Sequence, residues 1–79
     1  MATTAYIMIE AGVGKVGEVA AELRSLNGVT MVDVVIGPYD IIATVSADDM
    51  NSVSEVLSKR VHKIKGVTRT LTCISLQRT

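Results

Sequence analysis

Four residues near the middle of the chain, Gly37-Pro38-Tyr39-Asp40, constrain the fold more than any other segment. They separate two apolar runs, residues 29–36 and 41–45. Proline has a fixed φ that suits the second position of a tight turn, and glycine adopts backbone angles that other residues avoid. The segment therefore predicts the tip of a hairpin that joins two antiparallel strands.

The chain has the same order of elements on either side of this turn. A short β-rich run at residues 3–10 precedes apolar residues at helical spacing in residues 15–26. After the turn, a second helical pattern covers residues 50–65 and a last β-rich run covers residues 67–76. The sequence therefore predicts the order strand, helix, strand, strand, helix, strand.

Glycines and aspartates mark the ends of the predicted helices. Gly28 and Gly66 follow the two helical patterns, and glycine is the usual residue just past the end of a helix. Asp48 and Asp49 precede the second pattern, where a carboxylate caps free amides and complements the positive end of the helix dipole.

This order predicts an α+β fold of the ferredoxin-like kind. Right-handed crossovers place both helices on one face of a four-stranded antiparallel sheet. In the first strand, Ala5, Ile7 and Ile9 alternate with Tyr6 and Met8, so both faces of the sheet carry apolar groups. Because the helices cover only one face, we expect the other face to lie in a dimer interface.

Composition also favours a homo-oligomer. The chain has 79 residues, enough for one domain, and 48% of them are hydrophobic although it contains no Phe or Trp. A domain of this size buries only about 60% of the surface that its unfolded chain exposes, so its own core is marginal. Burying the surplus apolar surface against a second subunit would avoid an exposed, aggregation-prone patch.

Charge and cysteine content exclude several classes of partner. Eight basic and eight acidic residues cancel, which argues against an autonomous nucleic-acid-binding protein. The single cysteine, Cys73, cannot form an internal disulfide, as expected in a reducing cytoplasm. No apolar run approaches the roughly 18 residues that span a bilayer, and the N-terminus does not resemble a signal peptide. We therefore expect a cytoplasmic protein without a membrane partner.

Residues 12–17 form a literal G-x-G-x-x-G, and Asp33 follows at about the distance that a dinucleotide-binding fingerprint requires. That fingerprint belongs to a doubly wound parallel sheet, whereas the second strand here turns directly into a hairpin. Lys15 is also followed by Val16, where a phosphate-binding P-loop needs Ser or Thr. The glycines are better explained as loop and helix-capping residues, and no nucleotide cofactor is expected.

No reaction centre or metal site is visible in the sequence. The second helix ends in a basic run that favours a solvated helix face over nucleic-acid contact: Lys59, Arg60, His62, Lys63 and Lys65. His62 has no second ligand at metal-binding spacing. Cys73 lies in a strand without a neighbouring base and is expected to be a packed thiol. We therefore expect no enzyme activity, no metal and no cofactor.

Asp40 has two interpretations that the residues alone leave open. It can close the turn by accepting hydrogen bonds from nearby backbone amides. Alternatively, its carboxylate and the free amides of a bent loop can hold the ammonium and carboxylate of a small zwitterion.

The segment Val34-Val35-Ile36-Gly37-Pro38-Tyr39-Asp40-Ile41-Ile42-Ala43 resembles the G-x-[YF]-D signature of the Lrp/AsnC family of prokaryotic transcription regulators. The similarity is to their C-terminal ligand-binding domain, the RAM domain. Asp49-Met50 at the start of the second helix and Lys65-Gly66-Val67 before the threonine-rich last strand also match. The resemblance extends from about Tyr6 to Leu76.

The resemblance implies an assembly and a ligand site. Domains of this family form a βαββαβ sandwich that dimerises through its sheet, and the dimers assemble into rings. Free amino acids bind between dimers, with the hairpin loop as one wall. The loop residues that match are Gly37, Pro38, Tyr39 and Asp40. Weaker candidates, for the wall formed by a neighbouring subunit, are Met50, Thr70 and Thr72. Pro38 has no amide hydrogen, so this loop offers one donor fewer than most residues would give.

Full-length relatives carry an N-terminal helix-turn-helix domain, whereas the first strand here begins at about residue 3. We therefore expect residues 1–79 to be a single RAM-type domain without a DNA-binding domain. The expected function is an amino-acid-sensing module that modulates transcription or amino-acid metabolism through a partner, such as a full-length Lrp/AsnC regulator.

Three alternatives share this topology. One is a small dimeric α+β barrel enzyme, although the predicted interior is aliphatic and lacks reactive side chains. Another is an ACT-like amino-acid sensor, whose interface glycine would be Gly12 or Gly14. The third is an interaction module without a ligand.

Overall fold

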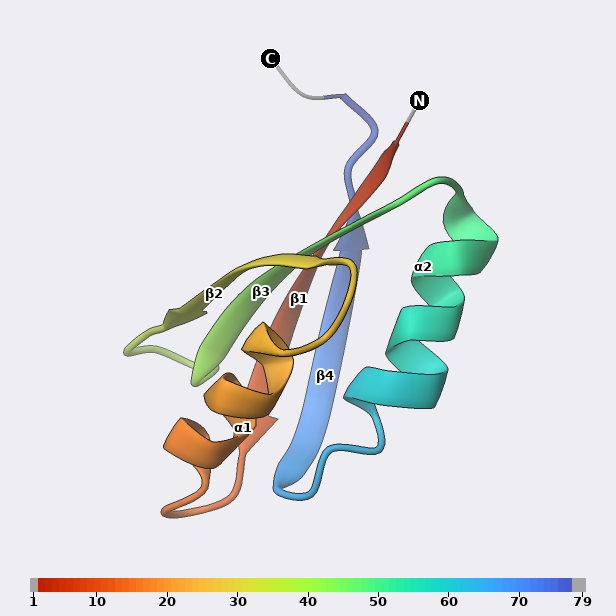
Figure 1. The fold of residues 1–79 in the computed structure, drawn as a ribbon. Coiled ribbons are helices and arrows are strands. Elements are labelled where there is room, and N and C mark those ends of the chain that lie inside the picture. Colours follow the sequence, from red (N-terminus) through yellow and green to blue (C-terminus); the bar gives the residue numbers. More distant parts are fainter. Residues whose placement is uncertain (1, 78–79) are drawn as a thin grey trace.

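The computed structural model describes residues 2–77 and contains the predicted order of elements (Figure 1). The elements are β1 (Thr3–Ala11), α1 (Val16–Arg24), β2 (Val29–Val34), β3 (Ile41–Ala47), α2 (Met50–Val56), the π-helix η1 (Leu57–Val61) and β4 (Val67–Ile74). The βαββαβ order is therefore confirmed, with strand and helix ends that differ from the predicted ones by a few residues.

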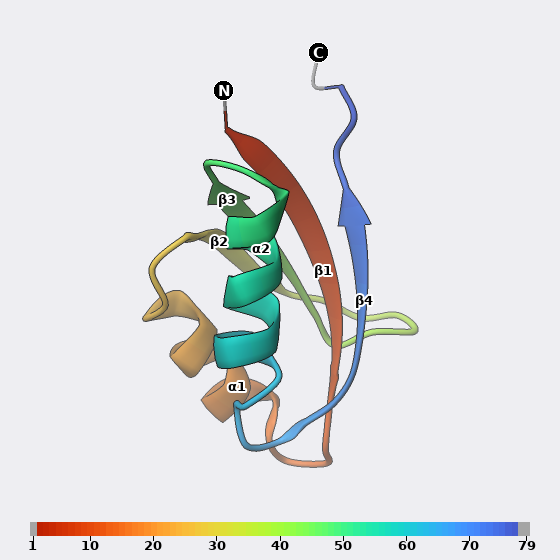
Figure 2. The same cartoon turned by 90° about the vertical axis from the view of Figure 1, so that its right-hand side faces the viewer.

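The four strands form one antiparallel sheet in the order β2-β3-β1-β4. Both helices lie on the same face of this sheet, and within residues 2–77 no helix covers the opposite face (Figure 2). This is the predicted ferredoxin-like arrangement. Because every strand pair is antiparallel, the sheet is not the doubly wound parallel sheet that a dinucleotide fingerprint requires.

The hydrophobic core lies between the helices and the sheet. Across β1 and β3, Ile7 pairs with Ala43 and Ile9 pairs with Ile41, so all four side chains point to the helix face. All four are fully buried. The core is completed by Val19 and Leu23 of α1, Val45 of β3, and Val53, Val61 and Ile64 of the second helical segment and the turn after it.

The opposite face of the sheet, here called the open face, is partly apolar. Tyr6 and Met8 of β1 point to it, as the alternation predicted, and Met8 pairs with Ile42 on one side and Leu71 on the other. The Leu71 side chain is 50% exposed. The chain therefore buries one face of its sheet and leaves apolar groups on the other.

The second helical segment differs from the prediction of one helix over residues 50–65. It is α-helical only to Val56 and continues as the wider π turn, in which the His62 amide donates to the Leu57 oxygen at 2.9 Å. Beyond it, the amides of Lys63 and Ile64 donate to oxygens only three residues back. The helix ends early because these tighter bonds replace helical ones.

The predicted start of the second helix is confirmed at Asp49, whereas α1 ends at Arg24 and the second helical segment at Val61, several residues before the glycines that were predicted to follow them. Gly28 and Gly66 instead lie directly before β2 and β4. Gly28 has φ +94° and Gly66 has φ +104°, a backbone region that L side chains rarely adopt. Asp49 caps α2, since its Oδ1 accepts a hydrogen bond from the Ser52 amide at 2.8 Å. This bond lowers the pKa of the Asp49 carboxyl below its usual value.

Within residues 2–77, the structure has no helix that is both long and apolar enough to cross a membrane.

Candidate functional site

The hairpin loop is longer than the predicted four-residue turn. The last strand pair is Val34 with Ile41, so the loop comprises six residues, 35–40. The Val35 amide donates to the Asp40 oxygen at 2.9 Å and closes the loop. Gly37 does not adopt a positive φ, so the backbone does not require glycine there. The loop projects from the open face, away from the helices (Figure 2).

Asp40 fastens this loop to β1. Its Oδ2 accepts a hydrogen bond from the Ala11 amide at 2.9 Å, and its own amide donates to the Ile9 oxygen at 2.9 Å. Of the two interpretations left open by the sequence, the first predicted a bond to a nearby amide of the turn, whereas the amide that bonds this carboxylate is that of Ala11, 29 positions away in the sequence. Among the described residues, no group donates a hydrogen bond to Asp40 Oδ1.

A β-bulge lies next to this anchor. The register of β1 and β4 shifts between Glu10 and Ala11. Opposite the shift, the Thr68 hydroxyl lies 3.0 Å from the Glu10 backbone oxygen and 3.1 Å from Glu10 Oε1. Bulges redirect side chains at the ends of strands and are frequent beside functional sites. Here the bulge lies where β1 meets both the hairpin loop and β4.

Tyr39 contacts the side chain of Arg69. The Arg69 Cζ lies 5.8 Å from the centre of the Tyr39 ring, which is within cation–π range. Arg69 pairs with Glu10 across β1 and β4 and so points to the open face. We call Glu10, Tyr39, Asp40 and Arg69 the hairpin-end cluster. It joins two carboxylates, a guanidinium and an aromatic ring at one end of the open face.

The loop also offers free backbone donors. Among the described residues, the amides of Ile36, Gly37 and Tyr39 donate no hydrogen bond, and Pro38 has no amide hydrogen. Backbone amides bind carboxylates, and a side-chain carboxylate such as that of Asp40 binds an ammonium group. The hairpin-end cluster and the adjoining loop amides therefore together have the two kinds of group that a zwitterion requires.

The other predicted ligand residues lie elsewhere in the same chain. Thr70 pairs with Ile9 and Thr72 with Ile7, which places both threonines on the helix face of β4. Met50 starts α2, beyond the end of β3 that is far from the hairpin loop (Figure 1). One chain does not bring these residues to the loop, so their place in a neighbouring subunit's wall stays a prediction.

Three surface hollows lie away from Asp40. One, of about 220 Å³, is formed by Val67, Thr68 and Thr70 with Arg69 and His62. His62 Nε2 and Thr70 Oγ1 are hydrogen-bonded at 3.1 Å. Another hollow, of about 200 Å³, lies between β3 and α2.

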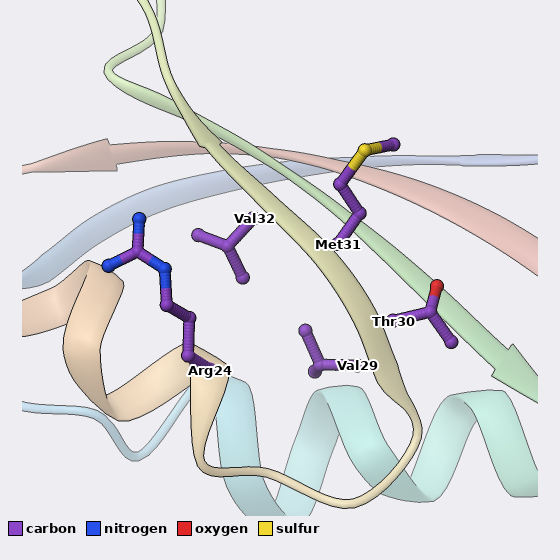
Figure 3. A pocket seen from close by; sticks show the side chains of 5 residues that line it. All are labelled: Arg24, Val29, Thr30, Met31 and Val32. Carbon is purple, nitrogen blue, oxygen red and sulfur yellow. The ribbon is translucent and has the colours of Figure 1, made fainter.

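The third hollow, of about 260 Å³, lies at the β2 edge of the sheet. In Figure 3, Arg24 at the end of α1 and Val32 lie on one side of the β2 ribbon, and Met31 lies on the other. Arg24 is the single charged residue among its lining residues. Because no carboxylate faces Arg24, this hollow lacks the opposite charges that bind both ends of an amino acid.

Sequence reasoning missed Glu10, Ala11 and Arg69 as parts of the site. Arg69 is the only charged residue of β4, and an isolated charge in a strand was a usable signal. Nothing in the sequence indicated that the Ala11 amide would be the partner of Asp40.

The described residues include no cluster of three His, Cys, Asp or Glu side chains that could hold a metal ion. Cys73, which the sequence predicted to be packed, is exposed in the single chain and pairs with Tyr6 on the open face.

Comparison with known families decides the identity of this fold. Residues 4–79 match the Lrp/AsnC ligand binding domain. The chain belongs to the Lrp/AsnC family. The resemblance inferred from the hairpin signature is therefore confirmed, and so is the prediction of a regulatory, non-enzymatic domain.

Three relatives illustrate the match. An uncharacterized HTH-type transcriptional regulator of Pyrococcus furiosus is 32% identical over an alignment of 79 positions, which covers 95% of this chain and 52% of that protein. The crystal structure of a Thermus thermophilus protein is 27% identical with a TM-score of 0.93, and the match covers 98% of this chain and 96% of that one. The third is a transcriptional regulator from Neisseria meningitidis, solved as a complex with L-Met. It shares the fold with a TM-score of 0.85 at 21% identity, over 95% of this chain and 50% of that one.

The chain spans about half the length of the curated relatives it matches, but nearly all of the Thermus protein.

Proposed function

We propose that this Lrp/AsnC domain is an amino-acid-binding regulatory module that assembles into dimers and then into a ring of dimers. It acts through a partner protein and not by binding nucleic acid itself. The observation that carries the proposal is that the free amides of the hairpin loop lie beside the Asp40 carboxylate of the hairpin-end cluster, at the edge of a partly apolar sheet face.

The dimer in this proposal forms through the open face. Met31 and Leu71 are 52% and 50% exposed on this face, and Tyr6, Met8 and Ile42 lie between them. Burial of apolar area gives about 25 cal/mol per Å², so covering these side chains supplies a driving force for association. A second copy presents the same face, and the contact is then self-complementary.

The ligand in this proposal is a free amino acid held at the hairpin-end cluster. Its ammonium group binds Asp40 Oδ1, and its carboxylate accepts hydrogen bonds from the amides of Gly37 and Tyr39. Pro38 and Tyr39 contact the ligand, while Met50, Thr70 and Thr72 of a neighbouring subunit complete the wall. The L-Met complex of the Neisseria regulator supports this class of ligand for the fold.

Ligand binding regulates by linkage. A ligand held between dimers stabilises the assembly that buries it, and so shifts the population toward that assembly. The HTH-type relatives support a partner that binds DNA, because this chain matches only about half of their length. We propose that the chain is a single domain that joins such a regulator in the cytoplasm, where the exposed Cys73 thiol stays reduced.

Native mass spectrometry with and without the twenty amino acids tests this function. We expect an even-numbered assembly larger than a dimer that gains one amino acid per subunit. Asp40→Asn should remove the mass gain, because the amide loses the charge that binds an ammonium group. An Asn oxygen can still accept from the Ala11 amide, so the loop stays anchored.

The matched control is Glu22→Gln, which removes the same charge from an exposed residue of α1. It should keep both the assembly and the mass gain. A plain dimer that gains no mass with any amino acid would contradict the proposed function. Equal mass gain by the wild type and by Asp40→Asn would contradict the assigned site.

A further inference from the structure

Acidic and basic residues are divided between two parts of the chain. Residues 1–55 contain all eight acidic and two basic residues, a net charge of −6, whereas residues 56–79 contain six basic and no acidic residues, a net charge of +6. The division falls between Glu55 and Lys59, inside the second helical segment. A neutral chain therefore carries a strong internal charge asymmetry.

The solvent side of α2 and η1 has this asymmetry along its length. Its acidic end carries three exposed carboxylates, those of Asp48, Asp49 and Glu55. Its basic end carries exposed Lys59, Arg60, His62, Lys63 and Lys65. Val53 and Val61, on the inner side of the same segment, are buried against the sheet. The outer surface thus has one negative and one positive end.

These charges are not neutralised within the described part of the chain. Glu55 and Lys59 have the i,i+4 spacing of a helical ion pair. Among residues 2–77, however, the only salt bridge joins Lys15 to Glu18 on the other helix, at 3.6 Å. The π turn begins between Glu55 and Lys59 and widens the helix there, which displaces Lys59 from the α-helical row of Glu55.

Short side chains occupy the middle of the same surface. Ser54 and Ser58 lie one turn apart, and the Ser58 hydroxyl donates to the Ser54 oxygen at 2.9 Å. A hydroxyl that is folded back onto its own helix projects little, so another helix can approach closely at this point.

We propose that the α2–η1 segments of two copies of this chain pack antiparallel about a two-fold axis. The acidic end of each segment then faces the basic end of the other. Three carboxylates oppose four Lys or Arg side chains and His62, so each chain supplies the charges that the other needs. A nucleic acid would also meet the basic end, but the acidic end of the same segment would repel its phosphates.

The inference rests on the sheet-face dimer of the proposed function and names the contact between dimers. Each chain then has two different self-complementary contacts, one on its open sheet face and one on α2. Two such two-fold contacts alternate around a ring when the geometry closes, and along a filament when it does not. The sheet-face contact is apolar and the α2 contact is ionic. A high salt concentration should therefore weaken the α2 contact and leave the sheet-face contact intact.

The test measures the mass of the full chain by light scattering at about 0.05 M and about 0.5 M NaCl, a range over which screening of exposed charges rises steeply. We expect the larger assembly at low salt and sheet-face dimers at high salt. Lys59→Glu and Glu55→Lys should each give dimers even at low salt, with dimer–dimer affinity reduced by at least about tenfold, because each change enters a two-fold contact twice.

An equimolar mixture of the two variants should restore the larger assembly, because positions 55 and 59 are then both acidic on one chain and both basic on the other. The matched controls on α1 are Arg24→Glu and Glu22→Lys, which reverse the same charges on exposed residues outside the surface. Both should assemble like the wild type. Far-UV circular dichroism confirms that each variant is folded.

Several results would overturn the inference. The first is an assembly that neither salt nor the two α2 variants affect. Another is a mixture of the variants that remains dimeric. A third is wild-type dissociation into dimers on addition of a short DNA duplex, which would make nucleic acid the partner of the basic end.

The sheet-face dimer is judged separately from the α2 contact. Dimers at high salt that do not assemble further at low salt would leave the dimer standing and reject the α2 contact. Monomers at high salt would instead reject the sheet-face dimer.

Discussion

The two faces of the sheet are built from the same strands, yet they reach different degrees of burial. Ile7 on the helix face is fully buried, whereas Leu71 on the open face is 50% exposed. Two helices are enough to cover one face of a four-stranded sheet and not both. This chain therefore completes one core by itself and leaves apolar side chains exposed on the other face of its sheet, where the proposed dimer would form a second core.

Charge separates the faces as well. The core side of the sheet is lined by aliphatic residues and threonines, while the open face carries Glu10, Asp33 and Arg69. A partner that covers the open face must satisfy these groups or leave them at the rim. The hairpin-end cluster is therefore the part of the open face that best suits the proposed polar ligand.

Substitutions at two adjacent residues of β1 should show the largest difference in stability between the two faces. Ile7→Ala should lower the free energy of unfolding by about 2–5 kcal/mol, because it leaves a cavity in the buried core. Urea denaturation should give this loss at every protein concentration. Met8→Ala, one residue along on the open face, should lose stability mainly at concentrations where the dimer forms. Equal, concentration-independent losses at both positions would contradict a second core between copies.

A charge on the open face should break the dimer without unfolding the chain. Leu71→Asp places an unpaired carboxylate in the proposed interface and should raise the dimer dissociation constant at least about a hundredfold. Analytical ultracentrifugation measures this change. The control is Val13→Asp, which alters a fully exposed apolar residue in the loop before α1. A dimeric Leu71→Asp variant would place the interface elsewhere.

Loss of the hydrogen bond that anchors the hairpin loop should have a smaller effect on stability. Asp40→Ala removes the acceptor of the Ala11 amide and should cost about 1 kcal/mol of stability. Asp40→Asn retains an acceptor and should cost less, although both variants lose the proposed ligand charge. Denaturation curves of the two variants without ligand separate anchoring from binding; identical losses would show that the hydrogen bond contributes little.

Substitutions of Asp49 test how much the cap of α2 stabilises the helix side of the molecule. Asp49→Ala should lower Tm by a few degrees, whereas Asp49→Asn should retain the cap. The folded state lowers the pKa of Asp49 from 3.8, so the charge of Asp49 stabilises above that pH. This contribution is lost as pH falls through the lower, folded pKa. Melting curves are measured from pH 7 to below pH 3.8. The Tm of the wild type should exceed that of Asp49→Asn at neutral pH, and this difference should shrink only at the acid end of the range.

Loss of the contact between Tyr39 and Arg69 should have the smallest effect on stability. An exposed cation–π pair contributes about 0.5–1 kcal/mol, so a double-mutant cycle with Tyr39→Leu and Arg69→Gln should give a coupling energy in that range. Coupling that rises when the dimer forms would place the pair inside the interface. Coupling near zero in both states would show that the two side chains act independently.

Much of the fold could be predicted from the sequence. Turn and cap residues such as Gly28, Asp49 and Gly66 placed the element ends to within a few residues, and alternation in β1 assigned Ile7 and Met8 to opposite faces. Alternation in β4 likewise grouped Thr70 with Thr72. The early end of the second helix could not be predicted, because apolar spacing fits a helix with or without a π turn.

The candidate site was predicted only in part, because its contacts join distant segments. The hairpin signature identified Asp40, but the pairing of β1 with its neighbours decides that Ala11 is its partner and that Arg69 lies beside Tyr39. The same pairing turns Thr70 and Thr72 to the helix face, and a register shift of one residue would have turned them to the open face. Periodicity and capping are local and are written in the sequence, so the sequence by itself determined the element order and the family. Strand register and loop anchoring depend on contacts between residues far apart in the chain, so only the tertiary structure decided which side chains share the site.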